Sequence, residues 1–364
     1  MAEVSEDQIA RLRLIRSENI GPVTYFQLLA RFGSASAALS AIPDLAARGG
    51  GRAPRLASRA SVEREIEQVA RLGARYLFLG QGLYPSLLAE IETAPPAMIV
   101  KGHLNLLDKT AVAVVGARNA SAAACRFARH LASGLGEAGT TVVSGLARGI
   151  DSAAHDGSLE AGTIAIIAGG IDVVYPPENE ARQQAIAERG LLVSEQPPGV
   201  EPRARHFPSR NRIIAGLAHG TVVVEAAPRS GSLITARLAA EYGREVMAVP
   251  GSPLDPRAQG CNQLIREGAT LIQNAGDVLE AINPLRIRPF RTPERGYEGS
   301  KTPDDADDSA RSAVISLLNA TPVPVDEIIR QAGLPPATVQ TILLELELAG
   351  RLERHAGGKA SLIP

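Results

Sequence analysis

Tryptophan is absent from this chain of 364 residues, and aromatic side chains make up only 3% of it. A contact with nucleic acid would therefore depend more on phosphate groups than on aromatic platforms for bases. Cysteine is almost as scarce, with only Cys125 and Cys261. The two are far apart and lack metal-ligand spacing, so we expect buried free thiols in a reducing compartment.

Neither sign of charge is in excess, because 38 Lys and Arg balance 39 Asp and Glu to a formal net charge of −1. This balance counts against a uniformly basic nucleic-acid binder. It permits a local basic groove, because the field depends on where the charges lie. The chain also lacks an apolar run of the roughly 20 residues that a membrane span needs, and its acidic N-terminus argues against a secretory signal. We therefore expect a cytoplasmic protein without membrane contact.

Residues 1–73 are expected to form a helical domain. An amphipathic stretch from Ile9 is interrupted by Asn-Ile-Gly-Pro at residues 19–22 and then resumes. Two helices joined by such a turn resemble a SAM or helix-hairpin-helix unit, whose turn offers backbone N–H groups to a phosphate. An ordinary helix–helix turn is the alternative.

Residues 74–285 alternate short β-rich runs with helical stretches. Runs such as 112–115 and 164–167 are apolar and rich in Val and Ile, whereas 121–138 carries apolar residues at helical spacing. Apolar, β-branched strands that alternate with helices predict a mainly parallel sheet covered on both faces. The fold class is therefore α/β, with a Rossmann-like doubly wound domain at its centre.

The end of the chain is expected to hold a linker, residues 286–309, and a winged-helix domain, residues 310–364. Three helical stretches followed by a hairpin are typical of a winged helix, and 336–349 would be its recognition helix. The side chains expected to be exposed on that helix are Thr338, Gln340, Thr341, Glu345 and Glu347. Because carboxylates repel a phosphate backbone, a protein-contact or structural role is favoured over DNA binding.

Two glycine-rich turns each lie between an expected strand and an expected helix. The first is Ser-Gly-Leu-Ala-Arg-Gly-Ile-Asp at residues 144–151, and the second is Arg-Ser-Gly-Ser-Leu-Ile-Thr-Ala at 229–236. Glycine lets a backbone approach an anion closely, and a helix start offers unpaired N–H groups. Four arginines lie between the turns, within residues 203–212. Together these features predict a groove for several phosphates, as in a polynucleotide backbone.

A third candidate lies at Gly116-Ala117-Arg118, directly after an expected strand. Ligands of open α/β sheets bind beyond the carboxyl ends of the strands, where Arg118 would clamp a phosphate. Phe207, between basic residues, is either a core residue or a ring that stacks on one base. The candidate DNA- or phosphate-binding residues are Gly116, Arg118, Ser144, Gly145, Arg148, Gly149, Arg203, Arg205, Phe207, Arg210, Asn211, Arg212, Gly231, Ser232 and Thr235.

The sequence gives little reason to expect catalysis. Ser144, Asp151 and His155 do not suggest a nucleophilic triad, because His155 falls one helical turn after Asp151, whose expected role is to cap the next helix. Glu225 is expected to be an arginine partner, although a general base is the alternative. No catalytic residue, metal or cofactor is expected, and the protein is not expected to be an enzyme.

These ordered motifs resemble the DNA-processing protein A (DprA, or Smf) family over roughly residues 8–285, and the C-terminal module fits one branch of it. The matching pieces are Val-Val-Gly-Ala-Arg at 114–118, the first glycine turn, His155, Pro-Ser-Arg-Asn-Arg-Ile-Ile-Ala-Gly-Leu at 208–217, and Gly-Ser-Leu-Ile-Thr-Ala at 231–236. Ala117 stands where the family often has serine, and Ser230 where it often has glycine.

The resemblance implies a cytoplasmic bacterial protein that binds single-stranded DNA through a basic pocket of its Rossmann-like domain. It also implies a homodimer that protects incoming DNA and loads the RecA recombinase during natural transformation.

Two other functions are considered. A related Rossmann-like family hydrolyses the N-glycosidic bond of nucleoside monophosphates and carries a Pro-Gly-Gly-x-Gly-Thr-x-x-Glu turn. The corresponding stretch here, residues 228–235, is not followed by a glutamate at the needed offset. A transcription regulator that reads DNA with its winged helix is the other alternative.

Overall fold

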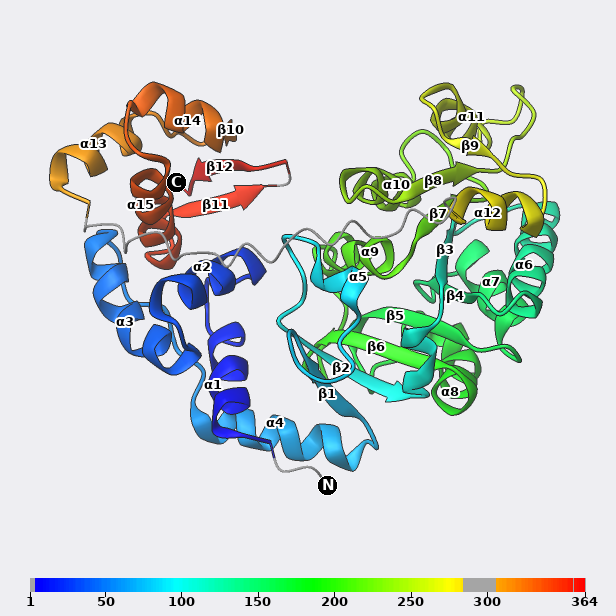
Figure 1. Ribbon diagram of the computed structural model, residues 1–364, viewed down its shortest axis with the longest axis horizontal. Coiled ribbons are helices and arrows are strands. Elements are labelled where there is room, and N and C mark those ends of the chain that lie inside the picture. The colour runs from blue at the N-terminus through cyan, green and yellow to red at the C-terminus, as the bar shows by residue number, and fades with distance from the viewer. Residues whose placement is uncertain (1–3, 284–305, 356, 364) are drawn as a thin grey trace. The chain divides into compact units, whose positions relative to one another are not determined.

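The computed structural model describes residues 4–283, 306–355 and 357–363 (Figure 1). These residues form two compact units. One unit combines residues 4–64 with 306–363, and the other comprises residues 65–283. Among the described residues, no helix is both long and apolar enough to cross a membrane. Both cysteines are free, with Cys261 buried and Cys125 half-buried.

A sheet of nine strands forms the centre of the unit that comprises residues 65–283, in the order β1-β2-β6-β5-β4-β3-β7-β8-β9. From β6 to β9 all neighbouring strands are parallel, whereas β1 and β2 add two antiparallel pairings at one edge. The strands are β1 (Arg75–Phe78), β2 (Ala97–Gly102), β3 (Ala111–Val115), β4 (Thr141–Ser144), β5 (Thr163–Gly170), β6 (Leu191–Gln196), β7 (Gly220–Val223), β8 (Glu245–Ala248) and β9 (Thr270–Leu271).

Helices cover both faces of this sheet, as the apolar strands require. α6 and α7 pack together on one face, and α9 and α10 pack together on the other (Figure 1). Val112 and Val114 of β3 are fully buried beneath α6 and α7. The helices of this unit are α5 (Ser86–Ala89), α6 (Ala122–Glu137), α7 (Ile150–Ser158), α8 (Glu180–Arg189), α9 (His206–Leu217), α10 (Ser232–Glu241), α11 (Gln259–Arg266) and α12 (Ala275–Ile282), with 3-10 turns η1 (Leu104–Asp108) and η2 (Pro177–Asn179). The predicted Rossmann-like α/β fold is confirmed.

The strand order reverses between β3 and β7. The chain runs from β3 through β4 and β5 to β6 on one side, and α9 then carries it back to β7 on the other side of β3. The carboxyl ends of β3 and β7 therefore open toward connections that leave in opposite directions. This is where open α/β sheets bind their ligands.

Four helices form the N-terminal part of the chain: α1 (Glu6–Ile15), α2 (Pro22–Phe32), α3 (Ala35–Arg48) and α4 (Arg59–Arg71). Ser5 caps α1 in a capping box with Gln8, and Pro22 starts α2, where a missing N–H costs no hydrogen bond. Fully buried Leu14 and Leu28 are part of the core that α1, α2 and α3 share. The predicted helical N-terminal domain is confirmed.

The C-terminal module is the predicted winged helix. It comprises α13 (Asp308–Ser316), β10 (Val323–Pro324), α14 (Val325–Ala332), α15 (Pro336–Leu348), β11 (Leu352–His355) and β12 (Lys359–Leu362). Its core is formed by residues such as Val339, Ile342 and Leu346 of α15. Most of the predicted linker lies outside the described residues, and α13 begins at Asp308, inside the predicted range. The bounds of the four predicted segments stay a prediction.

Two of the α15 side chains that we predicted to be exposed are in fact buried. Thr341 is 6% exposed and Glu345 is 0% exposed. The reason is that α15 is apolar on two sides, because Leu344 and Leu348 join the core of α1–α3 while the opposite side packs inside the winged helix. The sequence pattern indicates one apolar face on this helix, whereas the structure has two.

The carboxylates of α15 are also paired rather than free. Glu345 accepts hydrogen bonds from the Arg311 guanidinium, the closest at 3.0 Å, and Glu347 accepts one from Arg354 at 2.8 Å. The predicted repulsion of phosphates by two exposed glutamates therefore has no structural basis.

Candidate nucleic-acid interface

A pocket lies at the carboxyl ends of β4 and β5, where the first glycine turn meets the start of α9. Its volume is about 30 Å³. The lining residues are Arg118, Gly145, Leu146, Ala147, Arg148, Ile167, Ala168, Gly169, Val173, Tyr175, Pro176, Phe207 and Arg210. An open groove lies beside this pocket and shares part of its lining.

That groove extends from the pocket to the second glycine turn and has a volume of about 750 Å³. It lies at the carboxyl ends of β3 and β7, where the strand order reverses. It shares Arg118, Ala147, Phe207 and Arg210 with the pocket. Its further lining includes Gly116, Asn211, Arg229, Ser230, Gly231, Ser232, Ile234 and Thr235. The two glycine turns and the arginines between them thus border one continuous surface.

Arg210 forms the floor of this surface. Its side chain is 7% exposed, and its Nη1 donates to the Ile166 carbonyl at 3.3 Å. A Cβ atom at Gly145 would overlap the Arg210 guanidinium, so only glycine allows this approach. Burial lowers the pKa of Arg210 to about 10, so the guanidinium stays charged at neutral pH.

Asp151 is the buried counter-charge of Arg210. Its Oδ2 lies 4.0 Å from Arg210 Nη1 and accepts hydrogen bonds from the backbone N–H groups of Gly145, at 3.2 Å, and Ala147, at 3.3 Å. Burial raises the pKa of this carboxyl, and Arg210 opposes that rise. The N-cap of α7 is Gly149, so the prediction that Asp151 caps this helix was wrong. The carboxylate instead holds the turn and the arginine together.

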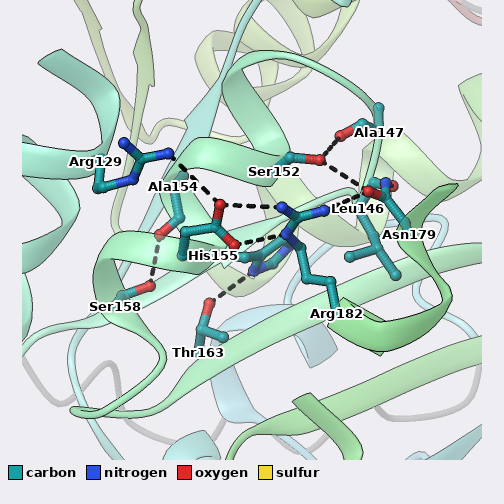
Figure 2. Close-up of polar contacts among 11 residues, drawn as sticks. Arg129, Leu146, Ala147, Ser152, Ala154, His155, Ser158, Thr163, Asn179 and Arg182 are labelled. Carbon is teal, nitrogen blue, oxygen red and sulfur yellow. Dashed lines mark hydrogen bonds and ion pairs between the residues drawn. The ribbon is translucent and has the colours of Figure 1, made fainter. Parts of the chain in front are cut away.

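Side chains behind the first glycine turn hold its carbonyl groups (Figure 2). Asn179 Nδ2 donates to the Leu146 carbonyl at 2.8 Å, and Ser152 Oγ donates to the Ala147 carbonyl at 2.7 Å. Leu146 has a φ of +54°, in the left-handed region that only glycine adopts freely. Arg182 donates to Asn179 Oδ1 and pairs with Asp156 at 2.6 Å. The turn is therefore strained and held from behind, which leaves its outer side to the pocket.

The second glycine turn starts α10 at the far end of the groove. Gly231 is the N-cap and supplies no side-chain hydrogen bond. The positive end of the helix dipole lies at the groove, which suits an anion. The Ser232 N–H donates to Ser230 Oγ at 3.4 Å and the Leu233 N–H donates to the Ser230 carbonyl at 3.1 Å, so the first turn of α10 is partly capped by Ser230. Asn211 Nδ2 donates to the Gly231 carbonyl at 3.3 Å, and Ser230 and Ser232 share a hydrogen bond of 2.8 Å.

Two aromatic rings flank Arg118 and Arg210. The Phe207 ring lies 4.9 Å from Arg118 Cζ and 5.6 Å from the Tyr175 ring, with the two rings inclined by 50°. Tyr175 is 45% exposed, and the sequence argument missed it. Its position in the loop after β5, at the same sheet edge as the two glycine turns, was the available signal.

The structure does not bring every predicted residue to this surface. Arg212 lies two positions after Arg210 on α9, about 200° around the helix, and it pairs with Glu195 at 2.5 Å and donates to the Thr93 carbonyl. Ser144 is fully buried, and its hydroxyl donates to the Val114 carbonyl at 2.7 Å. The remaining predicted residues that line neither the pocket nor the groove are Gly149, Arg203 and Arg205, the two arginines being exposed.

The polar side chains of His155 and Glu225 form hydrogen bonds within the fold. His155 Nδ1 lies 2.9 Å from Thr163 Oγ1, whose own hydrogen bond goes to the Val142 carbonyl. Burial lowers the pKa of His155 to about 3. Glu225 accepts two hydrogen bonds from Ser121, at 3.0 Å and 2.8 Å. Asp255 and, to a smaller extent, the charge of Glu225 raise the pKa of Arg257, so the predicted arginine partner stays a prediction. Within the described part of the chain, no group of His, Cys, Asp and Glu side chains is arranged to hold a metal.

Family models match three parts of the chain. The model of DNA recombination-mediator protein A matches residues 75–283, a DprA-like N-terminal HHH domain matches 5–68, and a DprA winged helix domain matches 298–358.

Among similar proteins, DNA processing protein DprA of Streptococcus pneumoniae is 49% identical over 198 residues, which are 54% of this chain and 70% of that protein. Protein Smf of Escherichia coli is 39% identical over 283 residues, 77% of this chain and 75% of that protein.

Two solved structures are also similar. The X-ray structure of DprA from Streptococcus pneumoniae superposes with a TM-score of 0.64 and 34% identity, covering 76% of this chain and 98% of that one. DprA from Helicobacter pylori, described for its mode of binding single-stranded DNA, superposes with a TM-score of 0.52 and 29% identity, covering 57% of this chain and 94% of that one.

Proposed function

Because the chain belongs to the DprA/Smf family, we propose that it is a DNA-processing protein that binds single-stranded DNA along the groove between its two glycine turns. One observation carries this proposal. Arg118 and Arg210 lie midway along a surface that has a glycine turn at each end. Such a surface offers positive charge to several phosphates in succession, as a nucleic-acid strand requires, and its glycine turns let the strand approach the backbone closely.

Each part of the surface has a distinct role in this proposal. Arg118, Arg148 and Arg210 contact phosphates near the first turn, and the start of α10 contacts another phosphate near Gly231 and Ser232 through its helix dipole and the Ser232 hydroxyl. Phe207 stacks on one base. The exposed Arg203 and Arg205 add to the positive field at the start of α9. Phosphate contacts position a strand without reading its bases, so little sequence preference is expected.

The finer parts of the proposal rest on family membership. In them the protein is a cytoplasmic homodimer without enzymatic activity. It protects incoming single-stranded DNA and loads the RecA recombinase on it during natural transformation.

The direct test is the salt dependence of binding to a single-stranded oligonucleotide. Arg118→Ala should weaken binding and make the slope of log K against log salt shallower by about 0.7, the share of one phosphate contact with a single strand. Arg189→Ala is the matched control, because Arg189 is exposed at the end of α8. It precedes β6 and so lies at the amino ends of the parallel strands, away from the groove at their carboxyl ends. An unchanged affinity and an unchanged slope in Arg118→Ala would show that the strand does not bind along this groove.

A further inference from the structure

The outer face of α15, the recognition helix of the winged helix, is apolar and covered. Val339, Ile342 and Leu346 face the winged-helix core, as this fold requires. Leu344 and Leu348 point to another side and are 3% and 0% exposed, in the core of α1–α3. A helix that is apolar on both sides is normally buried on both sides.

The backbones meet closely at this contact. A Cβ atom at Gly49 would overlap the Glu345 carbonyl, and one at Gly51 would overlap Ala349. Neither glycine has a positive φ. Close approach to α15, rather than an unusual backbone conformation, is therefore what explains glycine at these two positions.

Polar groups at the rim of the contact pair across it. Gln27 Nε2 donates to Gln340 Oε1 at 3.2 Å, and Arg31 Nη1 donates to Thr341 Oγ1 at 3.3 Å. At the end of the helix, Arg351 Nη1 donates to the Gly49 carbonyl at 3.1 Å. An apolar centre with a satisfied polar rim is the anatomy of a protein–protein interface.

The charge of this face points the same way. A helix that reads duplex DNA offers Arg, Lys, Asn or Gln to base edges and positive charge to phosphates. α15 contains no Arg or Lys. Its outer face has two leucines, with Gln340 and Thr341 engaged by Gln27 and Arg31, and buried Glu345 is paired with Arg311 at 3.0 Å.

We propose that the recognition face of α15 is a protein-docking face whose occupant is the N-terminal helical domain of the same chain. In this arrangement the winged helix binds the N-terminal helical domain and does not read duplex DNA with α15. This inference does not depend on what the groove binds. It also predicts that the apolar face is not available to a partner unless the N-terminal domain releases it.

The test cuts the full chain at a protease site inserted between residues 290 and 300 and then analyses the cut protein by size-exclusion chromatography. The C-terminal piece is expected to co-elute with the rest of the chain. The double variant Gly49→Ala/Gly51→Ala should raise the dissociation constant of the piece by roughly tenfold or more without altering the winged-helix sequence. Gly21→Ala is the matched glycine control, because a Cβ atom there meets nothing within 4 Å.

A second variant, Leu348→Asp, acts from the other side of the contact and should release a C-terminal piece that stays folded, as judged by its NMR spectrum. Separate elution of the pieces from the unmodified chain would overturn the proposal, as would retained binding in both variants or release of the piece by excess duplex DNA. A fall in the mass of the uncut chain with Gly49→Ala/Gly51→Ala would place the contact between two copies and overturn the assignment to one chain.

Discussion

At the scale of single residues, the two glycine turns use glycine for different reasons. Gly145 is required by the protein itself, because the Arg210 guanidinium occupies the space of a side chain. Gly231 is exposed, and a Cβ atom there would meet nothing within 4 Å. The fold therefore explains the first glycine and leaves the second to be explained by a ligand.

We predict that Gly231→Ala leaves the melting temperature unchanged and weakens binding of single-stranded DNA several-fold, because the added methyl group stands where a phosphate would approach α10. Gly145→Ala is the contrasting variant, and it should lower the melting temperature by displacing Arg210. Thermal unfolding and oligonucleotide titration of both variants measure the two effects. Full affinity in Gly231→Ala would mean that no strand comes close to this turn.

A second prediction concerns how His155 makes the stability of the protein depend on pH. Burial lowers its pKa to about 3, from an ordinary value near 6.5 in the unfolded chain. Below pH 6.5 the unfolded chain therefore binds a proton that the folded chain does not. The stability from neutral His155 is fully present above this pH and is lost as pH falls, by up to about 1.4 kcal/mol per pH unit.

The measurement compares the native chain with His155→Asn, which removes the titrating ring. The difference between their free energies of unfolding should shrink as pH falls from 7 to 5.5. The raised pKa of Asp151 changes stability in the opposite direction, but both chains contain Asp151, so its effect cancels in the difference. Parallel stability curves for the two chains would contradict the assignment.

At the scale of structural elements, the first glycine turn depends on side chains that approach it from behind. Asn179 is 2% exposed and donates to the carbonyl of Leu146, whose φ is positive. We predict that Asn179→Ala destabilises the protein by about 1–3 kcal/mol, the cost of an unsatisfied buried carbonyl. It should also weaken DNA binding at temperatures where the variant is fully folded, because the turn relaxes.

Asn274→Ala is the control for a general loss of stability. It removes the capping box of α12, whose residues line neither the pocket nor the groove, at a cost of about 1 kcal/mol. If both variants lose stability but only Asn179→Ala loses affinity, Asn179 positions the turn. Equal affinity in the two variants would leave Asn179 with a role in folding alone.

The elements themselves were largely predictable from the sequence. Most strands of the central sheet follow runs that contain Val or Ile, and both glycine turns follow strand ends, so the shared sheet edge was derivable. β1 (Arg-Tyr-Leu-Phe) and β9 (Thr-Leu) contain neither residue. Arg212 was not separable from Arg210 by sequence, because which side of α9 faces the groove depends on tertiary packing. Tyr175 was missed because a single aromatic residue in a loop carries no periodicity. The burial of Glu345 depends on Arg311, which binds its carboxylate, and on Gly49, which lies against its carbonyl, and neither contact is visible in the pattern of the helix alone.

At the scale of the whole molecule, the groove and the α15 contact belong to different units. Every residue that lines the groove or the pocket lies between Val115 and Thr235, inside the unit of residues 65–283. The contact of α15 with α1–α3 lies wholly in the other unit. DNA binding and the association of the winged helix with the N-terminal helical domain should therefore be separable by truncation.

We predict that a chain ending near Pro293 keeps its affinity for single-stranded DNA within a few-fold of the full chain, a difference of less than about 1 kcal/mol. The reason is the position of the groove, not the charge of α15, since Glu345 and Glu347 are paired.

The same truncation uncovers the apolar surface that receives Leu344 and Leu348, so residues 4–64 should lose stability and become more sensitive to proteolysis. Oligonucleotide titration and limited proteolysis of both chains measure the two effects. A tenfold loss of affinity in a truncated chain whose central domain is still folded would show that the winged helix grips DNA, with Arg351, Arg354 and Lys359 as the side chains to test first. Unchanged proteolysis of residues 4–64 would instead contradict the association of α15 with the N-terminal helical domain.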